Sequence, residues 1–160
     1  MSTQQQSLSE WVTQLNDTLF IQPDDAIALN AVQEQVDPSL VVKYITLRSL
    51  FYQLRQQHIN LIKRIPRINH NVYTYDQFKP GLLYARSSST SIQDTFSVIL
   101  QWENKGNGEN TDGVVAVLSK WRVKDKATGK ETKKTNVILW EVRLIDGKRK
   151  LVGQTEVETV

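Results

Sequence analysis

Three stretches close the chain and decide its fold: residues 114–124 (VVAVLSKWRVK), 135–145 (TNVILWEVRLI) and 150–157 (KLVGQTEV). Each concentrates or alternates apolar residues in the manner of a β-strand. The breaks between them, Ala127-Thr128-Gly129-Lys130 and Asp146-Gly147-Lys148, have the composition of hairpin turns. Together these stretches predict a meander of long antiparallel strands.

Upstream of the meander, residues 94–103 predict a further strand, followed by a Gly-Asn loop at 106–110. Strict alternation would place its apolar side chains on one face of the sheet; these are Phe96, Val98, Leu100 and Trp102. Residues 87–90 (SSST) are expected to form a loop. Residues 40–44 (LVVKY) predict a short single strand, and residues 59–78 predict one or two strands of less regular pattern.

Helical patterns fill the start of the chain. Apolar residues three and four apart predict a helix over 8–20, preceded by a capping box of Ser7 and Glu10. A second helix is expected to open at Pro23-Asp24-Asp25, where proline and carboxylates suit a helix N-terminus. It should end before Asp37-Pro38, because the residue before a proline avoids the helical conformation.

A third helix is expected over residues 47–58, where apolar residues again recur at helical spacing. Helices followed by a series of antiparallel strands are typical of an α+β domain. The prediction is therefore three N-terminal helices packed on one face of a curved, mostly antiparallel sheet. With 160 residues the chain fits one domain, expected over 1–160 with a disordered tail at 1–6.

The composition argues against several classes of protein. There is no cysteine, so neither a disulfide nor a thiolate nucleophile is expected. The 20 basic and 17 acidic side chains give a formal charge of +3, too even a balance to argue for nucleic-acid binding. The sequence shows neither a secretory signal nor an apolar run of membrane-spanning length. We therefore expect a cytoplasmic protein, with access to the nucleus left open, that binds neither nucleic acid nor membrane.

Three titratable residues are the first candidates for proton transfer. His58 and His70 could each act as a general base if buried beside a substrate. Asp94 is an acid or base candidate because Phe96 follows on the same face. A surface or structural role is the more common one for such residues. The two histidines lack the spacing and the acidic neighbour of a metal site, so no metal is expected.

Glu141 is the fourth candidate. Alternation places Glu141 and Arg143 on the face of Val137 and Leu139. The other face carries Ile138, Trp140, Val142 and Leu144. Both faces of this strand are thus largely apolar, a pattern that favours a homodimer formed sheet to sheet. The plain alternative is that Glu141 pairs with a cross-strand lysine or arginine at the solvated end of the sheet.

Aromatic side chains are candidates for binding a small ligand. The ligand-binding candidates are Tyr44, Tyr52, Phe96, Trp102, Trp121 and Trp140. The three tryptophans fall on different strands of the predicted meander and could line one pocket that stacks a flat molecule. The competing interpretation is that they fill the core of a bent sheet or an interface.

The order of elements, together with Pro23-Asp24-Asp25-Ala26, resembles the SnoaL-like branch of the nuclear-transport-factor-2-like superfamily. The closing segment is similar to fungal members in Gly113-Val114-Val115-Ala116-Val117, Ala127-Thr128-Gly129-Lys130-Glu131, Trp140-Glu141-Val142, Asp146-Gly147-Lys148-Arg149-Lys150 and Thr155-Glu156-Val157. The resemblance implies a cone, in which a strongly curved sheet wraps the helices and leaves a mouth that opens into an apolar pocket. It implies relatives that are isomerases, dehydratases and cyclases of hydrophobic substrates, or non-catalytic binding and dimerising domains.

Two functions from different classes follow. The first is a dimeric binding module whose apolar pocket holds a small hydrophobic ligand, or whose surface engages a partner protein. The alternative is a cofactor-free isomerase, dehydratase or cyclase that acts on a polyketide- or terpenoid-like substrate by general acid/base catalysis. No cofactor is expected in either case. Burial discriminates between them, because a titratable candidate enclosed beside a second titratable group would favour the enzyme.

Overall fold

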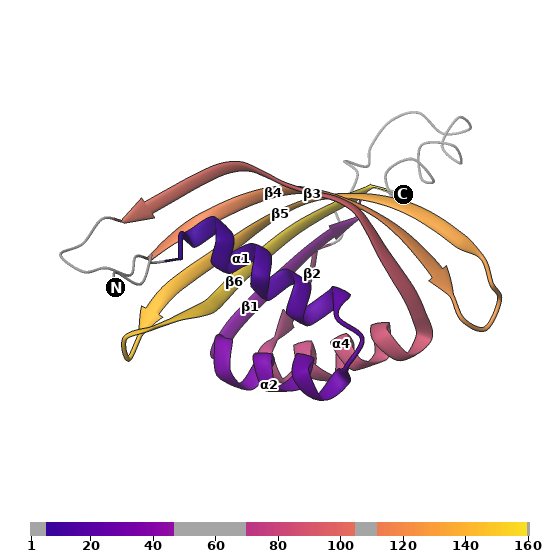
Figure 1. Ribbon diagram of the computed structural model, residues 1–160, viewed down its shortest axis with the longest axis horizontal. Helices are drawn as coiled ribbons and strands as arrows, with labels where there is room; N and C mark the ends of the chain where they lie inside the picture. Colours follow the sequence, from indigo (N-terminus) through magenta and orange to yellow (C-terminus); the bar gives the residue numbers. More distant parts are fainter. Residues whose placement is uncertain (1–5, 47–69, 105–111, 160) are drawn as a thin grey trace, which may run out of the picture.

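The computed structural model describes residues 6–46, 70–104 and 112–159. In chain order its elements are α1 (Leu8–Asn16), the π-helical turn η1 (Asp17–Ile21), α2 (Asp25–Gln35), β1 (Val36–Thr46), β2 (His70–Thr74), α4 (Tyr75–Ser88), β3 (Ser89–Asn104), β4 (Asp112–Asp125), β5 (Glu131–Ile145) and β6 (Lys148–Thr159). Figure 1 shows the sheet arching over α1, α2 and α4. The predicted helix over 47–58 and the predicted loop at 106–110 lie outside the described residues.

The six described strands form one sheet in the order β2-β1-β6-β5-β4-β3. Every pair is antiparallel except β1 with β6, which is parallel. The predicted meander is confirmed, with strands longer than the sequence pattern indicated. The β5–β6 turn has positive φ angles at Asp146 (51°) and Gly147 (73°), the left-handed conformation that an Asp-Gly hairpin turn requires.

The first two helices begin where their capping residues predict. Ser7 accepts a hydrogen bond from the Glu10 amide (3.2 Å), and the Ser7 amide donates to the Glu10 carboxylate (2.8 Å), so the capping box is present. The helix then continues through η1 to Ile21, close to the predicted end. The N-cap of α2 is Asp24, and this helix ends at Gln35, before Asp37-Pro38 as expected.

Helix α4 corrects the prediction of a loop at residues 87–90. Ser87 and Ser88 end α4, and Ser89 and Thr90 begin β3. The helix starts with a capping box, in which the Thr74 amide donates to the Gln77 side chain at 3.0 Å. Proline at position 80 and the burial of Leu82 alone explain why no helical pattern is visible in the sequence.

Strand β3 corrects a second prediction, that its four apolar residues share one face. A register shift lies between Val98 and Leu100 in the pairing with β4. Val98 pairs with Val117 on the face that the helices cover, whereas Leu100 pairs with Ala116 on the opposite face. The extra residue of such a bulge reverses the alternation, so that Leu100 and Trp102 turn away from Phe96 and Val98.

The core lies between the helices and the face of the sheet that they cover, which we call the concave face; the opposite face is the outer face. The fully buried core side chains include Leu8, Val12, Leu15, Val115, Val117, Trp140 and Leu151. Arg86 ties α4 to the neighbouring helices: it bonds Asp25 (2.6 Å) and the carbonyls of Leu19 (3.0 Å) and Gln22 (2.8 Å). The helices are thus fixed against the concave face by apolar packing and by this arginine.

Candidate functional site

A polar cluster interrupts the apolar packing of the concave face. Three neighbouring strands supply it, because the register pairs Asn136 with Glu158, Trp140 with Gln154, and Tyr44 with Glu156. Cross-strand partners point to the same side of a sheet. The set that we call the concave cluster is Tyr44, Lys134, Asn136, Gln154, Glu156 and Glu158.

Glu156 is the centre of the concave cluster. Its carboxylate accepts hydrogen bonds from the side-chain amides of Asn136 and Gln154, the latter at 3.2 Å. Burial, followed by the negative charge of Glu158, raises the pKa of Glu156 to about 7, although the bond from Asn136 and the charge of Lys134 act in the opposite direction. This carboxyl group can therefore gain or lose a proton near neutral pH, which ordinary glutamates cannot do.

Glu158 is the second carboxylate and is buried. The Lys134 ammonium lies 2.9 and 3.1 Å from its two oxygens, and the Lys134 side chain is 30% exposed. The Tyr44 phenol faces the same carboxylate. Burial and this neighbouring carboxylate raise the pKa of Tyr44 far above its usual range, so the phenol stays protonated.

Three buried side chains beside Glu156 keep a polar atom without a hydrogen-bond partner among the described residues. They are Asn136 (6% exposed) through Oδ1, Gln154 (4%) through Oε1, and Trp140 (0%) through Nε1. Buried polar atoms are nearly always bonded in folded proteins, so three orphans beside one carboxylate call for an explanation. The concave face thus carries two free acceptors and one free donor next to a titratable group.

The four titratable candidates from the sequence do not meet in this cluster. Asp94 lies in β3 and pairs with Arg122 at 2.9 Å, with both side chains partly exposed. That hydrogen bond lowers the pKa of Asp94, so the carboxylate stays ionised. His70 is the first residue of β2, and the structure describes its backbone only. His58 lies outside the described residues.

Glu141 lies on the outer face, as the alternation predicts. Its side chain extends over Gly153, where an added Cβ would come within 2.9 Å of the Glu141 carboxyl carbon. The prediction that Glu141 pairs with a cross-strand lysine or arginine is wrong for the described part of the chain, where the only carboxylates in ion pairs are Asp25, Asp94 and Glu158. The side chain is exposed, so Glu141 lacks the burial that would alter its chemistry.

The predicted aromatic candidates fall into separate groups. Tyr44 belongs to the concave cluster, Trp140 borders it, and Phe96 packs against the core. Trp121 lies on the concave face against Phe20 of η1, with ring centroids 6.5 Å apart in an edge-to-face arrangement. Trp102 lies on the outer face and is 59% exposed, so the structure does not bring the three tryptophans together. Tyr52 lies outside the described residues.

The outer face carries an exposed apolar patch. Its most exposed members are Leu100 (68%) and Trp102 (59%), and Val41 and Leu139 extend it across the sheet. Glu141 lies within the patch, in the same row of paired residues as Trp102 and Val41, whereas Lys120 and Lys133 lie toward the other end of β4 and β5.

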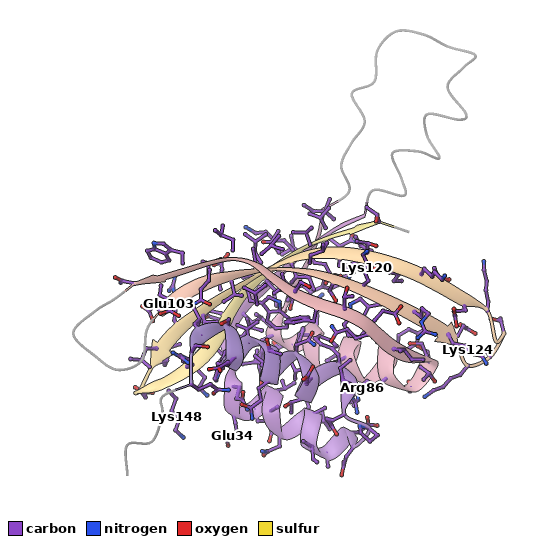
Figure 2. All side chains as sticks on the ribbon, turned by 45° about the horizontal axis from the view of Figure 1, so that its top comes forward. Glu34, Arg86, Glu103, Lys120, Lys124 and Lys148 are labelled. Atoms are coloured by element: carbon purple, nitrogen blue, oxygen red, sulfur yellow. The ribbon has the colours of Figure 1, made fainter. Side chains whose placement is uncertain are left out.

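A polar pocket of about 300 Å³ lies at the far end of the molecule, lined by Gln6, Trp11, Glu34, Gln35, Lys148 and Arg149. Figure 2 shows Glu34 and Lys148 at this end. Arg149 is already bonded there to the carbonyls of Gln6 (2.7 Å) and Ser7 (3.2 Å). We therefore assign this pocket a structural role and take the concave cluster as the candidate site.

Glu156 and Glu158 were missed by the sequence analysis. The available signal was the polar alternation of Gln154, Glu156 and Glu158 in the last strand, together with Asn136 on the strand before it. Read alone, this alternation indicates a solvated face. Only the register with Trp140 and Ile138 shows that these residues share the buried face.

No group of three or more histidine, cysteine or acidic side chains in the described ranges could hold a metal ion. Among the same residues, no helix has the length and apolar character needed to cross a membrane.

Comparison with known proteins identifies the fold. No protein-family model and no curated protein matches the chain. Among solved structures it is similar to a ketosteroid isomerase-like protein from Erwinia carotovora atroseptica, with a TM-score of 0.62 and 11% identity over 98% of this chain and 97% of that one. It is also similar to the NTF2-like domain of Mex67 from Chaetomium thermophilum, in complex with Mtr2, with a TM-score of 0.56 and 7% identity over 96% and 87% of the two chains. The chain therefore has the nuclear-transport-factor-2-like fold.

Proposed function

We propose that this chain is a dimeric binding domain that receives a small, largely apolar ligand at the concave cluster. The observation that carries the proposal is the set of three orphaned polar atoms on Asn136, Trp140 and Gln154. Each such atom costs about 1–3 kcal/mol when it is buried without a partner. A ligand that bonds to these atoms would remove that cost. Ile138, which pairs with Glu156 in the sheet, is an apolar core neighbour of these atoms.

The outer face supports the dimer. An exposed apolar patch that contains Leu100 and Trp102 marks an interaction surface. A second copy suits it, because a two-fold axis running across the strands would bring Glu141 of each copy toward Lys120 of the other. In this one arrangement the apolar patches of the two copies face each other and their opposite charges pair.

Native mass spectrometry of protein purified from its own source tests both parts together. We expect a mass of two chains plus a retained small molecule, which denaturation releases. A second sample that carries Asn136→Leu and Gln154→Leu should lose the small molecule but keep the dimer. A wild-type dimer that never carries a small molecule, or a double variant that retains the molecule as the wild type does, would contradict the ligand site.

Proton transfer by Glu156 is the second candidate function, favoured by its pKa of about 7. A general base works best when its pKa lies near the working pH. The protonated Tyr44 hydroxyl of the same cluster would turn from Glu158 to donate to a developing oxyanion. The site would then act as an isomerase or cyclase without a cofactor.

Deuterium incorporation separates catalysis from binding. The molecule recovered from the native protein is incubated in D2O with fresh protein. An acid/base enzyme that removes a C–H proton reversibly should raise the mass of that molecule, and Glu156→Gln should abolish the gain. A molecule that returns with unchanged mass would favour the binding domain.

A further inference from the structure

We propose that the concave cluster recognises a protonated amine on an otherwise apolar ligand. This inference rests on the proposed function, namely that the concave face binds a small molecule, and adds the chemical class of its polar group.

Acceptors outnumber donors in the concave cluster. The amide nitrogens of Asn136 and Gln154 already donate to Glu156, and the Lys134 ammonium donates to both oxygens of Glu158. The amide oxygens of Asn136 and Gln154 remain without a partner among the described residues, although both side chains are more than nine-tenths buried. The orphaned atoms are thus two acceptors against one donor, Trp140 Nε1.

The charges point to the same ligand. Within the described part of the chain, two carboxylates, Glu156 and Glu158, face one ammonium group, that of Lys134. Lys134 lies against Glu158, so the hydrogen bonds to Glu156 come from neutral amides. An ammonium group brings one positive charge and three N–H donors, which match Glu156 and the two amide oxygens.

Other ligand groups fit this cluster less well. A carboxylate or phosphate would meet two glutamates, and the one ammonium that the described residues place in the cluster is already bonded to Glu158. A carbonyl could accept from Trp140 Nε1 but would leave both amide oxygens unbonded. A divalent cation would find two carboxylates, and the described residues offer no third acidic, histidine or cysteine ligand to complete a site.

Binding of an amine should release a proton from the protein. A concave cluster that only stabilises the fold would not produce this release. Among the residues that the structure describes, the charged and titratable groups around Glu156 are Glu158 on its own strand, Lys134 on β5 and Tyr44 on β1. An ammonium ligand beside Glu156 would favour its ionised form and lower the pKa from about 7. Binding near neutral pH should therefore expel the proton of Glu156, and the affinity for an amine should rise with pH across this range.

The test uses three probes of one shape: 1-naphthylmethylamine, 1-naphthalenemethanol and 1-naphthoic acid. Their affinities for the full chain are measured by isothermal titration calorimetry at about pH 6 and about pH 8. We expect the amine to bind about tenfold or more tighter than the alcohol at the higher pH, which is the worth of one charge-assisted hydrogen bond. The preference should shrink at the lower pH. Repeating the amine titration in two buffers of different ionisation enthalpy measures the released proton without any variant.

Glu156→Gln and Glu141→Gln form the matched pair of variants. The first should remove the preference for the amine and the proton release while the alcohol still binds; the second changes an exposed carboxylate on the outer face and should alter neither. An alcohol or acid that binds as tightly as the amine, or amine binding without proton release, would overturn the amine proposal and leave the ligand site standing. A wild-type protein that binds none of the three probes, while it unfolds cooperatively, would contradict the amine proposal; the retained molecule in the native mass spectrum decides the ligand site separately.

Discussion

Two glutamates on adjacent strands of one sheet show how much the face of the sheet decides. Glu141 of β5 is exposed on the outer face, where it lies over Gly153. Glu156 of β6 is on the concave face, where burial and Glu158 raise its pKa to about 7. The two side chains are chemically identical. Position relative to the helices, and not residue type, makes only one of them a candidate for proton transfer or ligand recognition.

The largest expected effect is a difference in unfolding free energy between substitutions at two neighbouring residues of β5, one on each face of the sheet. Trp140→Ala removes a fully buried side chain from the concave face and should cost about 3–5 kcal/mol of unfolding free energy. Leu139→Ala removes a side chain that is 37% exposed on the outer face, so its cost to the folded chain should be far smaller. Urea denaturation of both variants measures the difference. Equal losses would show that the outer face is packed as tightly as the concave face.

The dependence of stability on pH comes next in size. The folded pKa of Glu156, about 7, lies above the ordinary value of 4.5, so the folded state holds this proton more tightly than the unfolded chain does. The stabilisation from this group is complete below pH 4.5 and is lost as the pH rises through about 7. The loss amounts to up to about 3 kcal/mol, because one pKa unit corresponds to about 1.4 kcal/mol.

Urea denaturation at a series of pH values checks this prediction. Glu156→Gln should flatten the fall between pH 4.5 and 7. Glu141→Gln, the change on the opposite face, should keep the wild-type profile. A wild-type profile without any fall in this window would show that Glu156 is not desolvated.

A substitution on the outer face should change the stability of the dimer. Leu100→Asp places a charge at a side chain that is 68% exposed, so the folded chain should tolerate it while the apolar patch is lost. We expect the dimer to weaken by about 1–3 kcal/mol, the range for an interface residue of this kind. Sedimentation velocity over a dilution series measures the dissociation constant. An unchanged constant would move the interface away from the outer face.

Reversing the charges on the outer face tests how the two copies are oriented. Lys120→Glu should weaken the dimer, and adding Glu141→Lys should restore it, because the proposed two-fold axis brings these residues together across the interface. The effect of each single change should be smaller than that of Leu100→Asp, since charges at the rim of an interface contribute little. Additive losses in the double variant would reject this orientation of the two copies.

Asp94→Asn should have the smallest effect. Its ion pair with Arg122 is exposed to solvent, and surface ion pairs of this kind contribute little to stability. We expect ligand affinity to stay unchanged and the free energy of unfolding to change least of all the variants. A large loss of ligand binding would restore Asp94 as a site residue.

The fold could be predicted from local signals in the sequence. The capping box at Ser7 and the Asp-Gly turn at 146–147 each act over a few residues, so their outcome is visible in the sequence. Helix α4 could not be predicted, because Pro80 and the burial of Leu82 alone leave no periodic pattern. The bulge between Val98 and Leu100 could not be predicted either, since a register shift depends on the neighbouring strand.

The candidate site depended on longer-range information. Tyr44 and Trp140 were identified as ligand-binding candidates from their chemistry; Tyr44 belongs to the concave cluster and Trp140 borders it. Glu156 was not identified, because its raised pKa arises from burial and from the neighbouring Glu158 and is unrelated to any local motif. Polar residues that alternate in a strand indicate either a solvated face or a buried site, and only the pairing of strands distinguishes the two.

Titration of the Glu156 side-chain carboxyl by ¹³C NMR, with and without 1-naphthylmethylamine, tests the role of the concave cluster most directly. We predict that the Glu156 carboxyl titrates with a midpoint near pH 7 in the free protein and that this midpoint falls when the amine is added. A midpoint at the ordinary value of 4.5 that does not respond to the amine would contradict this prediction.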